Sequence, residues 1–304
     1  MVRTPLELPG WVDFNVWRTG LKAQPIATQQ GGGASAIFYL DHRGRVRLPP
    51  NNAYLPIVSL SNRDTPSGRA ADWHRAAAPL VEEMASRGVV NQVDLPPEIE
   101  DVRPWIWRNF VVGVRYTHFV DFPFDEGFAD RGTRRSISKA VALGLTATKV
   151  LEPELVTRCL AETEKRQGLS HQVGGRDLEK ASELLGAESL RMYVCTDSRG
   201  RPLSSAVMLH EPRTRAIAWL AGTDTGPGAK GAAHLLWRAV FEDLSEAGAD
   251  GVDLCGGLIP SVSAFKARMG GRLVVNYSVR TPSLRAGARA LVNSLRFAKG
   301  PVDR

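Results

Sequence analysis

The segment of this chain best suited to chemistry is residues 250–271, D-G-V-D-L-C-G-G-L-I-P-S-V-S-A-F-K-A-R-M-G-G. The short apolar run at 252–254 predicts a buried strand, and the glycine pair after it lets the backbone turn or be approached closely. A helical turn should then present Phe265 and Lys266 before a second glycine pair ends it. A lysine held beside an aromatic ring at the end of a strand is suited to an anionic or ester-bearing substrate.

A simpler interpretation of the same two residues places Phe265 in the core and leaves Lys266 as a solvated surface cation. That interpretation suits an isolated Phe-Lys pair. Here a strongly helical pattern ends at Gly248 just before the segment, and a strand pattern follows its second glycine pair. This order of elements favours the functional interpretation.

The rest of the chain alternates strand and helix patterns, which predicts an α/β (α+β) fold. In the N-terminal third we expect a helix at 70–87 and strands at 36–40, 45–48, 54–60, 89–95 and 105–112. Further along we expect strands at 116–122, 146–151, 190–196, 203–209 and 216–220, and helices from about 125 to 144, at 152–168, 176–185 and 232–247.

This order, with D-x-x-G-G and F-K-x-x-x-G-G near its end, resembles the second half of the Fem-type (FemABX-like) aminoacyltransferases, a branch of the GNAT acyltransferase superfamily. The resemblance covers roughly the C-terminal two thirds of the chain, back through residues 219–247, 190–209 and 134–150. It implies two tandem GNAT-like domains, each with a mixed, mostly antiparallel sheet flanked by helices.

The length of 304 residues also fits two packed domains. We expect an N-terminal GNAT-like domain at 1–120 and a C-terminal one, carrying the Phe-Lys motif, at 121–282. The last part, residues 283–304, predicts an amphipathic helix with one basic face. By the resemblance, this helix would pack back on the first domain.

The resemblance implies transfer of an amino acid from aminoacyl-tRNA to an amino group of a peptide acceptor, which forms an amide bond. Lys266 would contact the ester or the terminal ribose as charge develops, and Phe265 would pack beside the terminal adenosine. The acceptor would be a precursor in peptidoglycan biosynthesis, or a peptide or carrier-bound intermediate in antibiotic biosynthesis. No Ser-His-Asp or Cys-His pattern indicates an acyl-enzyme. Asp253 is a candidate general base or, alternatively, the cap of the turn after its strand.

Positive charge gathers at the C-terminal end. The chain has a net charge of +7, and residues 266–304 contain nine Lys or Arg and one acid. Clustered cations predict a polyanionic partner, although such a face can also be merely solvated. The resemblance identifies the partner as tRNA, with its acceptor stem held by Arg268, Arg272, Arg285, Arg289 and Arg296.

The donor depends on residues 222–236, G-T-D-T-G-P-G-A-K-G-A-A-H-L-L. A GNAT enzyme that uses acyl-CoA holds the pyrophosphate on a loop R/Q-x-x-G-x-G/A. Here Gly228 stands where Arg or Gln is expected, which favours tRNA as donor and no separate cofactor. Lys230 could bind a phosphate of either donor. An acyl-CoA-dependent N-acyltransferase is therefore the alternative, and a non-enzymatic RNA-binding module is a third.

Composition predicts neither a metal site nor a membrane span. The three cysteines show no C-x-x-C spacing, and no two of the six histidines stand at i and i+4. No apolar run approaches the roughly 18 residues that cross a bilayer, and the first residues lack the apolar core of a signal peptide. We therefore expect a cytoplasmic protein without a metal.

Overall fold

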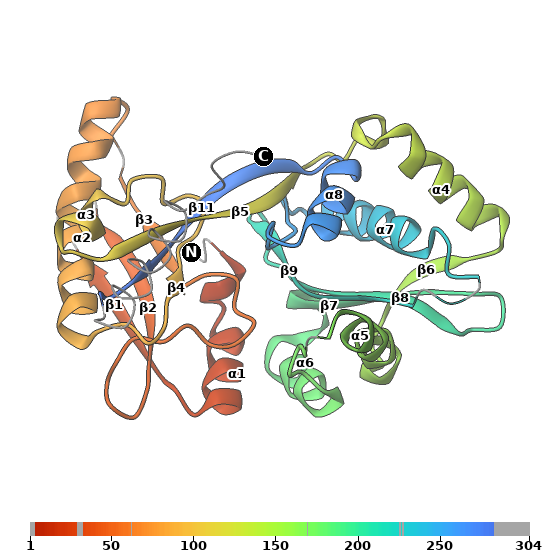
Figure 1. Ribbon diagram of the computed structural model, residues 1–304, viewed down its shortest axis with the longest axis horizontal. Coiled ribbons are helices and arrows are strands. Elements are labelled where there is room, and N and C mark those ends of the chain that lie inside the picture. The colour runs from red at the N-terminus through yellow and green to blue at the C-terminus, as the bar shows by residue number, and fades with distance from the viewer. Residues whose placement is uncertain are drawn as a thin grey trace, which may run out of the picture.

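The chain forms two lobes joined by a pair of long strands (Figure 1). The computed structural model describes residues 4–28, 33–61, 63–168, 170–224, 226 and 228–282. The predicted helix at 283–304, with Arg285, Arg289 and Arg296, lies outside the described residues. Within the described ranges, no helix has both the length and the apolar character needed to cross a membrane.

The N-terminal lobe is built on an antiparallel three-stranded sheet covered by one long helix. In chain order its elements are η1 (Pro5–Glu7), α1 (Pro9–Thr19), β1 (Lys22–Thr28), β2 (Ala34–Leu40), β3 (Ile57–Ser59), α2 (Pro66–Arg87), β4 (Val93–Asp94) and α3 (Arg103–Trp107). The sheet order is β1-β2-β3. Trp73, Ala77, Leu80 and Met84 recur at helical spacing on α2 and are buried against the sheet, as their period predicts.

The second lobe holds most of a mixed eight-stranded sheet of order β4-β11-β5-β10-β9-β8-β7-β6. Helices α4 and α7 lie on one face of it, and α5 and α6 lie on the other (Figure 1). In chain order the elements are β5 (Val111–Asp121), η3 (Glu126–Phe128), α4 (Arg131–Ala142), β6 (Thr146–Val150), α5 (Pro153–Gln167), α6 (Gly175–Ser189), β7 (Leu190–Thr196), β8 (Pro202–Leu209), β9 (Arg215–Thr223), α7 (Ala232–Glu246), β10 (Gly251–Asp253), α8 (Pro260–Arg268) and β11 (Arg272–Arg280).

Strands β5 and β11 connect the lobes (Figure 1). They pair antiparallel from Phe119 with Arg272 to Val111 with Arg280. Strand β5 runs through the boundary predicted between residues 120 and 121, and β4 pairs with β11 from the other side. Both predicted domains therefore contribute strands to one sheet, and the residue bounds given to the two domains remain a prediction.

Two predictions in the N-terminal third are wrong. The first part of the strand expected at 105–112 is instead helix α3 followed by a turn, and only residues 111–112 belong to β5. Trp105 is fully buried on α3 and donates its indole N–H to the Met84 sulfur. Asn109, with a φ of 62°, completes that turn. The return strand expected at 45–48 is reduced to Val46, which bridges to Leu40 and Val89.

Helix α1, which the sequence patterns did not predict, packs on the second lobe. The rings of Trp11 and Phe14 lie 5.0 and 5.4 Å from that of Trp219 on β9. A Cβ added at Gly10 would lie 2.2 Å from the carbonyl oxygen of Leu184, so α1 touches α6 backbone to backbone. The N-terminal helix thus contributes to the core of the second lobe.

Helix α5 also contacts the end of β9 backbone to backbone, as α1 contacts α6. A Cβ added at Gly222 would lie 2.5 Å from the carbonyl carbon of Cys159. The Thr163 hydroxyl accepts a hydrogen bond from the backbone N–H of Thr223 at 2.8 Å and donates to its carbonyl at 3.3 Å. These contacts hold α5 against the outer part of β9.

Replacing Gly222 by alanine should destabilise the protein by about 1–3 kcal/mol, because the added methyl overlaps the α5 backbone. Urea denaturation measures the free energy of unfolding. Gly175→Ala is the control, since a Cβ there would meet nothing within 4 Å, and it should change stability by no more than about 0.5 kcal/mol. Equal stability of the Gly222→Ala variant and the wild type would contradict the close contact.

Candidate active site

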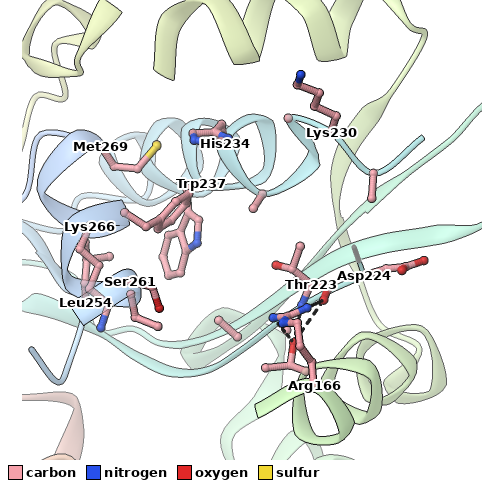
Figure 2. Close-up of a pocket in the computed structure, with 18 of the residues that line it drawn as sticks. Arg166, Thr223, Asp224, Lys230, His234, Trp237, Leu254, Ser261, Lys266 and Met269 are labelled. Carbon is pink, nitrogen blue, oxygen red and sulfur yellow. Dashed lines mark hydrogen bonds between the residues drawn. The ribbon is translucent and has the colours of Figure 1, made fainter. Parts of the chain in front are cut away.

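The site forms where two parallel strands separate. Strand β10 pairs with β9 along Gly251–Asp253 and then ends, whereas β9 continues to Thr223 without that neighbour. After β10 the chain turns through Cys255 and Gly256, whose φ angles are 50° and 66°, and enters α8. A cavity of about 820 Å³ opens at this separation, lined by residues of β9, α5, α7 and α8 (Figure 2).

The cavity has two chemically different ends. Figure 2 places Lys266, Leu254, Ser261 and Met269 around one end, next to Trp237. Arg166, Thr223, Asp224 and Lys230 lie toward the other end, together with the glycines of the 226–231 loop. One end is therefore mainly apolar with a single cation, and the other is polar and basic.

Lys266 lies at the apolar end and is anchored by the turn after β10. Its ammonium donates hydrogen bonds to the carbonyl oxygens of Cys255 and of Gly256, the latter at 2.8 Å. Burial lowers the pKa of Lys266, and the neighbouring Asp253 carboxylate opposes that effect. Lys266 is thus a fixed cation at the cavity rather than a solvated surface residue.

Phe265 both lines the cavity and belongs to the edge of the core. Its ring is half-buried, packs against the core cluster that includes Trp237 and Phe241 of α7, and lies 5.0 Å from the ring of His234. Burial lowers the pKa of His234, Arg268 lowers it further, and Asp130 opposes both effects. A neutral imidazole and a phenyl ring therefore form one wall of the cavity.

Asp253 ties the two lobes together directly behind Lys266. Its carboxylate is 3% exposed and accepts hydrogen bonds from the Tyr54 hydroxyl at 2.7 Å, from the Thr117 hydroxyl, and from the Cys255 N–H at 2.8 Å. Burial raises its pKa, and these hydrogen bonds oppose the rise. Asp253 does not line the 820 Å³ cavity. This arrangement favours the turn-capping role over that of a general base.

The start of α7 opens on the polar end of the cavity. Gly231 is the N-cap with a φ of 88°, and a Cβ there would lie 2.5 Å from the Ser136 carbonyl oxygen of α4. No side chain caps the first turn of α7, and exposed Lys230 precedes it. The predicted phosphate loop therefore reaches the same cavity as Lys266, at its opposite end.

The two predicted arginines that the structure describes, Arg268 and Arg272, lie outside the cavity. Arg268 is exposed at the end of α8, and Arg272 is 61% exposed at the start of β11, where it pairs with Asp121 at 3.6 Å. Neither lines the cavity. Sequence reasoning missed other lining residues, of which His234, Trp237 and Phe241 share one face of a predicted helix. Their spacing shows that they share a face of the helix, but it does not show that this face lines the cavity.

In the described part of the chain, no group of three or more His, Cys, Asp or Glu side chains could hold a metal ion. The three cysteines are all free.

The fold of the chain is similar to several solved structures. FemX superimposes with a TM-score of 0.63 and 12% sequence identity, over 90% of this chain and 91% of FemX. The C-terminal domain of a putative lysylphosphatidylglycerol synthetase from Agrobacterium fabrum has a TM-score of 0.57 and 15% identity, over 92% and 90%. L-PGS from Bacillus licheniformis has a TM-score of 0.54 and 14% identity, over 96% and 98%.

No family model and no curated protein matches the sequence of the chain. The structural similarity nevertheless extends over nine-tenths or more of this chain in all three comparisons. It confirms the Fem-like, double-GNAT fold that the sequence predicted. The chain thus has the Fem-like fold, and the candidate site lies where the central strands of the second lobe separate.

Replacing Tyr54 by phenylalanine should destabilise the protein by about 1.5–3 kcal/mol, because the buried Asp253 carboxylate loses a hydrogen-bond donor. Chemical denaturation measures the change. Tyr277→Phe on β11 is the matched control, since the hydroxyl of this half-buried tyrosine forms no hydrogen bond with any described residue, and it should change stability by no more than about 0.5 kcal/mol. Equal effects of the two substitutions would refute the importance of the Tyr54 contact.

Proposed function

We propose that this protein is an aminoacyltransferase that moves an amino acid from aminoacyl-tRNA to an amino group of a peptide acceptor. The observation that carries the proposal is the anchored Lys266 at the apolar end of a cavity whose other end is the glycine loop with Lys230. The terminal phosphates of tRNA would lie near Lys230 and the uncapped start of α7. The ester that joins the amino acid to the ribose would then lie beside Lys266.

The reaction needs little beyond positioning and charge stabilisation, because the ester is already activated. The acceptor nitrogen attacks the ester carbonyl, the new carbon–nitrogen bond forms, and the carbon–oxygen bond to the ribose breaks. The proton lost by the amine ends on the ribose oxygen, so the products are an amide and free tRNA. Lys266 would stabilise the negative charge that develops on the ester oxygens.

The state of the cysteines supports direct transfer without an acyl-enzyme. Burial raises the pKa of Cys255, the cysteine nearest to Lys266, well above its usual range. Burial also raises the pKa of Cys159 to about 11 and that of Cys195 to about 12. Thiols with such pKa values are protonated near neutral pH and are therefore poor nucleophiles.

The exposed arginines would bind tRNA outside the cavity. Arg268 and Arg272 lie on α8 and β11, the elements that flank Lys266 in sequence, and would contact the acceptor stem without reading its sequence. The acceptor amine would belong to a peptidoglycan precursor or to a peptide or carrier-bound antibiotic intermediate. The proposed reaction needs no separate cofactor.

A second candidate function is acyl-CoA-dependent N-acyl transfer. It is favoured by the start of α7, which lines the cavity and whose first turn no side chain caps. It is disfavoured by Gly228, which stands where acyl-CoA-dependent enzymes carry Arg or Gln. In either reaction the acyl group would end beside Lys266.

Lys266→Met should lower the rate of transfer from aminoacyl-tRNA by about 10²–10³-fold, because it removes the charge that stabilises the transition state. The assay incubates total radiolabelled aminoacyl-tRNA with the enzyme and a panel of peptide amines, with and without ribonuclease. Lys180→Met, which removes a surface lysine paired with Glu183, is the control and should keep full activity. Weaker RNA binding by Lys266→Met without any transfer by the wild type would instead support an RNA-binding module.

The rate should fall as pH rises through the pKa of Lys266, because only the protonated lysine stabilises the developing charge. Since burial lowers this pKa, the fall should be centred below the ordinary lysine value of about 10.4. The measurement is kcat/KM against pH for the wild type and for Lys266→Arg, whose charge persists throughout. A similar fall in both proteins would show that another group titrates.

A further inference from the structure

We infer that the transferred amino acid carries an uncharged, apolar side chain, which binds in the part of the cavity beside Lys266. This inference rests on the proposed aminoacyl transfer and names the substrate class. We call this part of the cavity the apolar compartment, and it is formed by Trp237, Phe241, Leu254, Val262, Phe265 and Met269.

The orientation of the bound donor follows from the different chemistry of the two ends of the cavity. Phosphates require the polar end, where Lys230 and the start of α7 supply donors and positive charge. The ester must reach Lys266, which lies at the opposite end (Figure 2). The amino-acid side chain lies beyond the ester, so the space left for it is the apolar compartment.

The walls of the apolar compartment are firmly packed. Trp237, Leu254 and Met269 are 7%, 5% and 0% exposed, and all three belong to the core cluster beneath α7. Figure 2 shows them converging on the end of the cavity that holds Lys266. Such a preformed apolar wall stabilises an apolar side chain by removing its surface from water.

The compartment offers no carboxylate to pair with a cationic side chain. Among the described residues that line the cavity, Asp224 is the only carboxylate, and it lies toward the other end (Figure 2). It is already engaged, since it accepts a hydrogen bond from the Gly226 N–H at 2.7 Å and pairs with Arg201 at 3.3 Å. A lysyl or arginyl group would be buried unpaired and next to the Lys266 cation, which is strongly unfavourable.

The experiment measures binding, so that no acceptor is needed. The probes are RNA hairpins with a tRNA-like 3′ end, joined by a stable amide to a leucyl, glycyl or lysyl group, together with the uncharged hairpin. Calorimetry measures Kd for the wild-type protein. Leucyl hairpin should bind about tenfold or more tightly than glycyl hairpin, and lysyl hairpin no better than glycyl.

Val262→Asp places a carboxylate in the compartment and should reverse this preference. Aspartate is tolerated there because Val262 is half-buried in the first turn of α8, where negative charge favours the helix. Lysyl hairpin should then bind more tightly than leucyl hairpin. Ala264→Asp is the matched control, since Ala264 is exposed on the same helix and does not line the cavity, and it should keep the wild-type order.

The inference and the proposed function fail in different ways. Equal binding of leucyl and glycyl hairpins, or tighter binding of lysyl hairpin by the wild type, would overturn the inference and leave tRNA-dependent transfer standing. Failure to bind any hairpin, charged or uncharged, would overturn both. An unchanged preference in Val262→Asp would also count against the compartment as the side-chain site.

Discussion

The site depends on the buried carboxylate of Asp253. A buried charge is costly unless hydrogen bonds satisfy it, and here the donors come from Tyr54, Thr117 and the backbone of Cys255. These groups belong to the N-terminal lobe, to the bridging strand β5 and to the turn after β10. One carboxylate therefore joins both lobes and holds the turn whose carbonyl oxygens anchor Lys266.

The same turn ends β10 after three residues, and the cavity opens where β10 stops. Because the chain leaves the sheet after Asp253, the outer part of β9 has no parallel neighbour on that side. The other walls pack closely because two positions lack a side chain. Gly222 lets the α5 backbone contact β9, and Gly231 lets the start of α7 contact the α4 backbone. The cavity is thus a consequence of strand separation combined with two close backbone contacts.

The two ends of the cavity differ in their chemistry, as the proposed transfer of an acyl group requires. Lys230 and the uncapped first turn of α7 lie at the end formed by the glycine loop, while the opposite end combines one anchored cation with a packed apolar wall. A donor with phosphates at one end and an ester at the other matches this difference. The glycine loop and the Phe-Lys motif are separate in the sequence, and the cavity brings them together at its two ends.

Local patterns in the sequence determined most helices and strands of the second lobe, the alternation of the fold, and the choice of Phe265, Lys266 and Lys230 as candidate site residues, all of which line one cavity. Such patterns depend on neighbours within a few turns, so they are readable without the structure. Only the tertiary structure decided that Trp105 is helical, that α1 packs on the second lobe, that Arg268 and Arg272 lie outside the cavity, and that Tyr54 meets Asp253. Those outcomes depend on burial against residues far away in the chain, and periodicity carries no information about which distant surfaces meet.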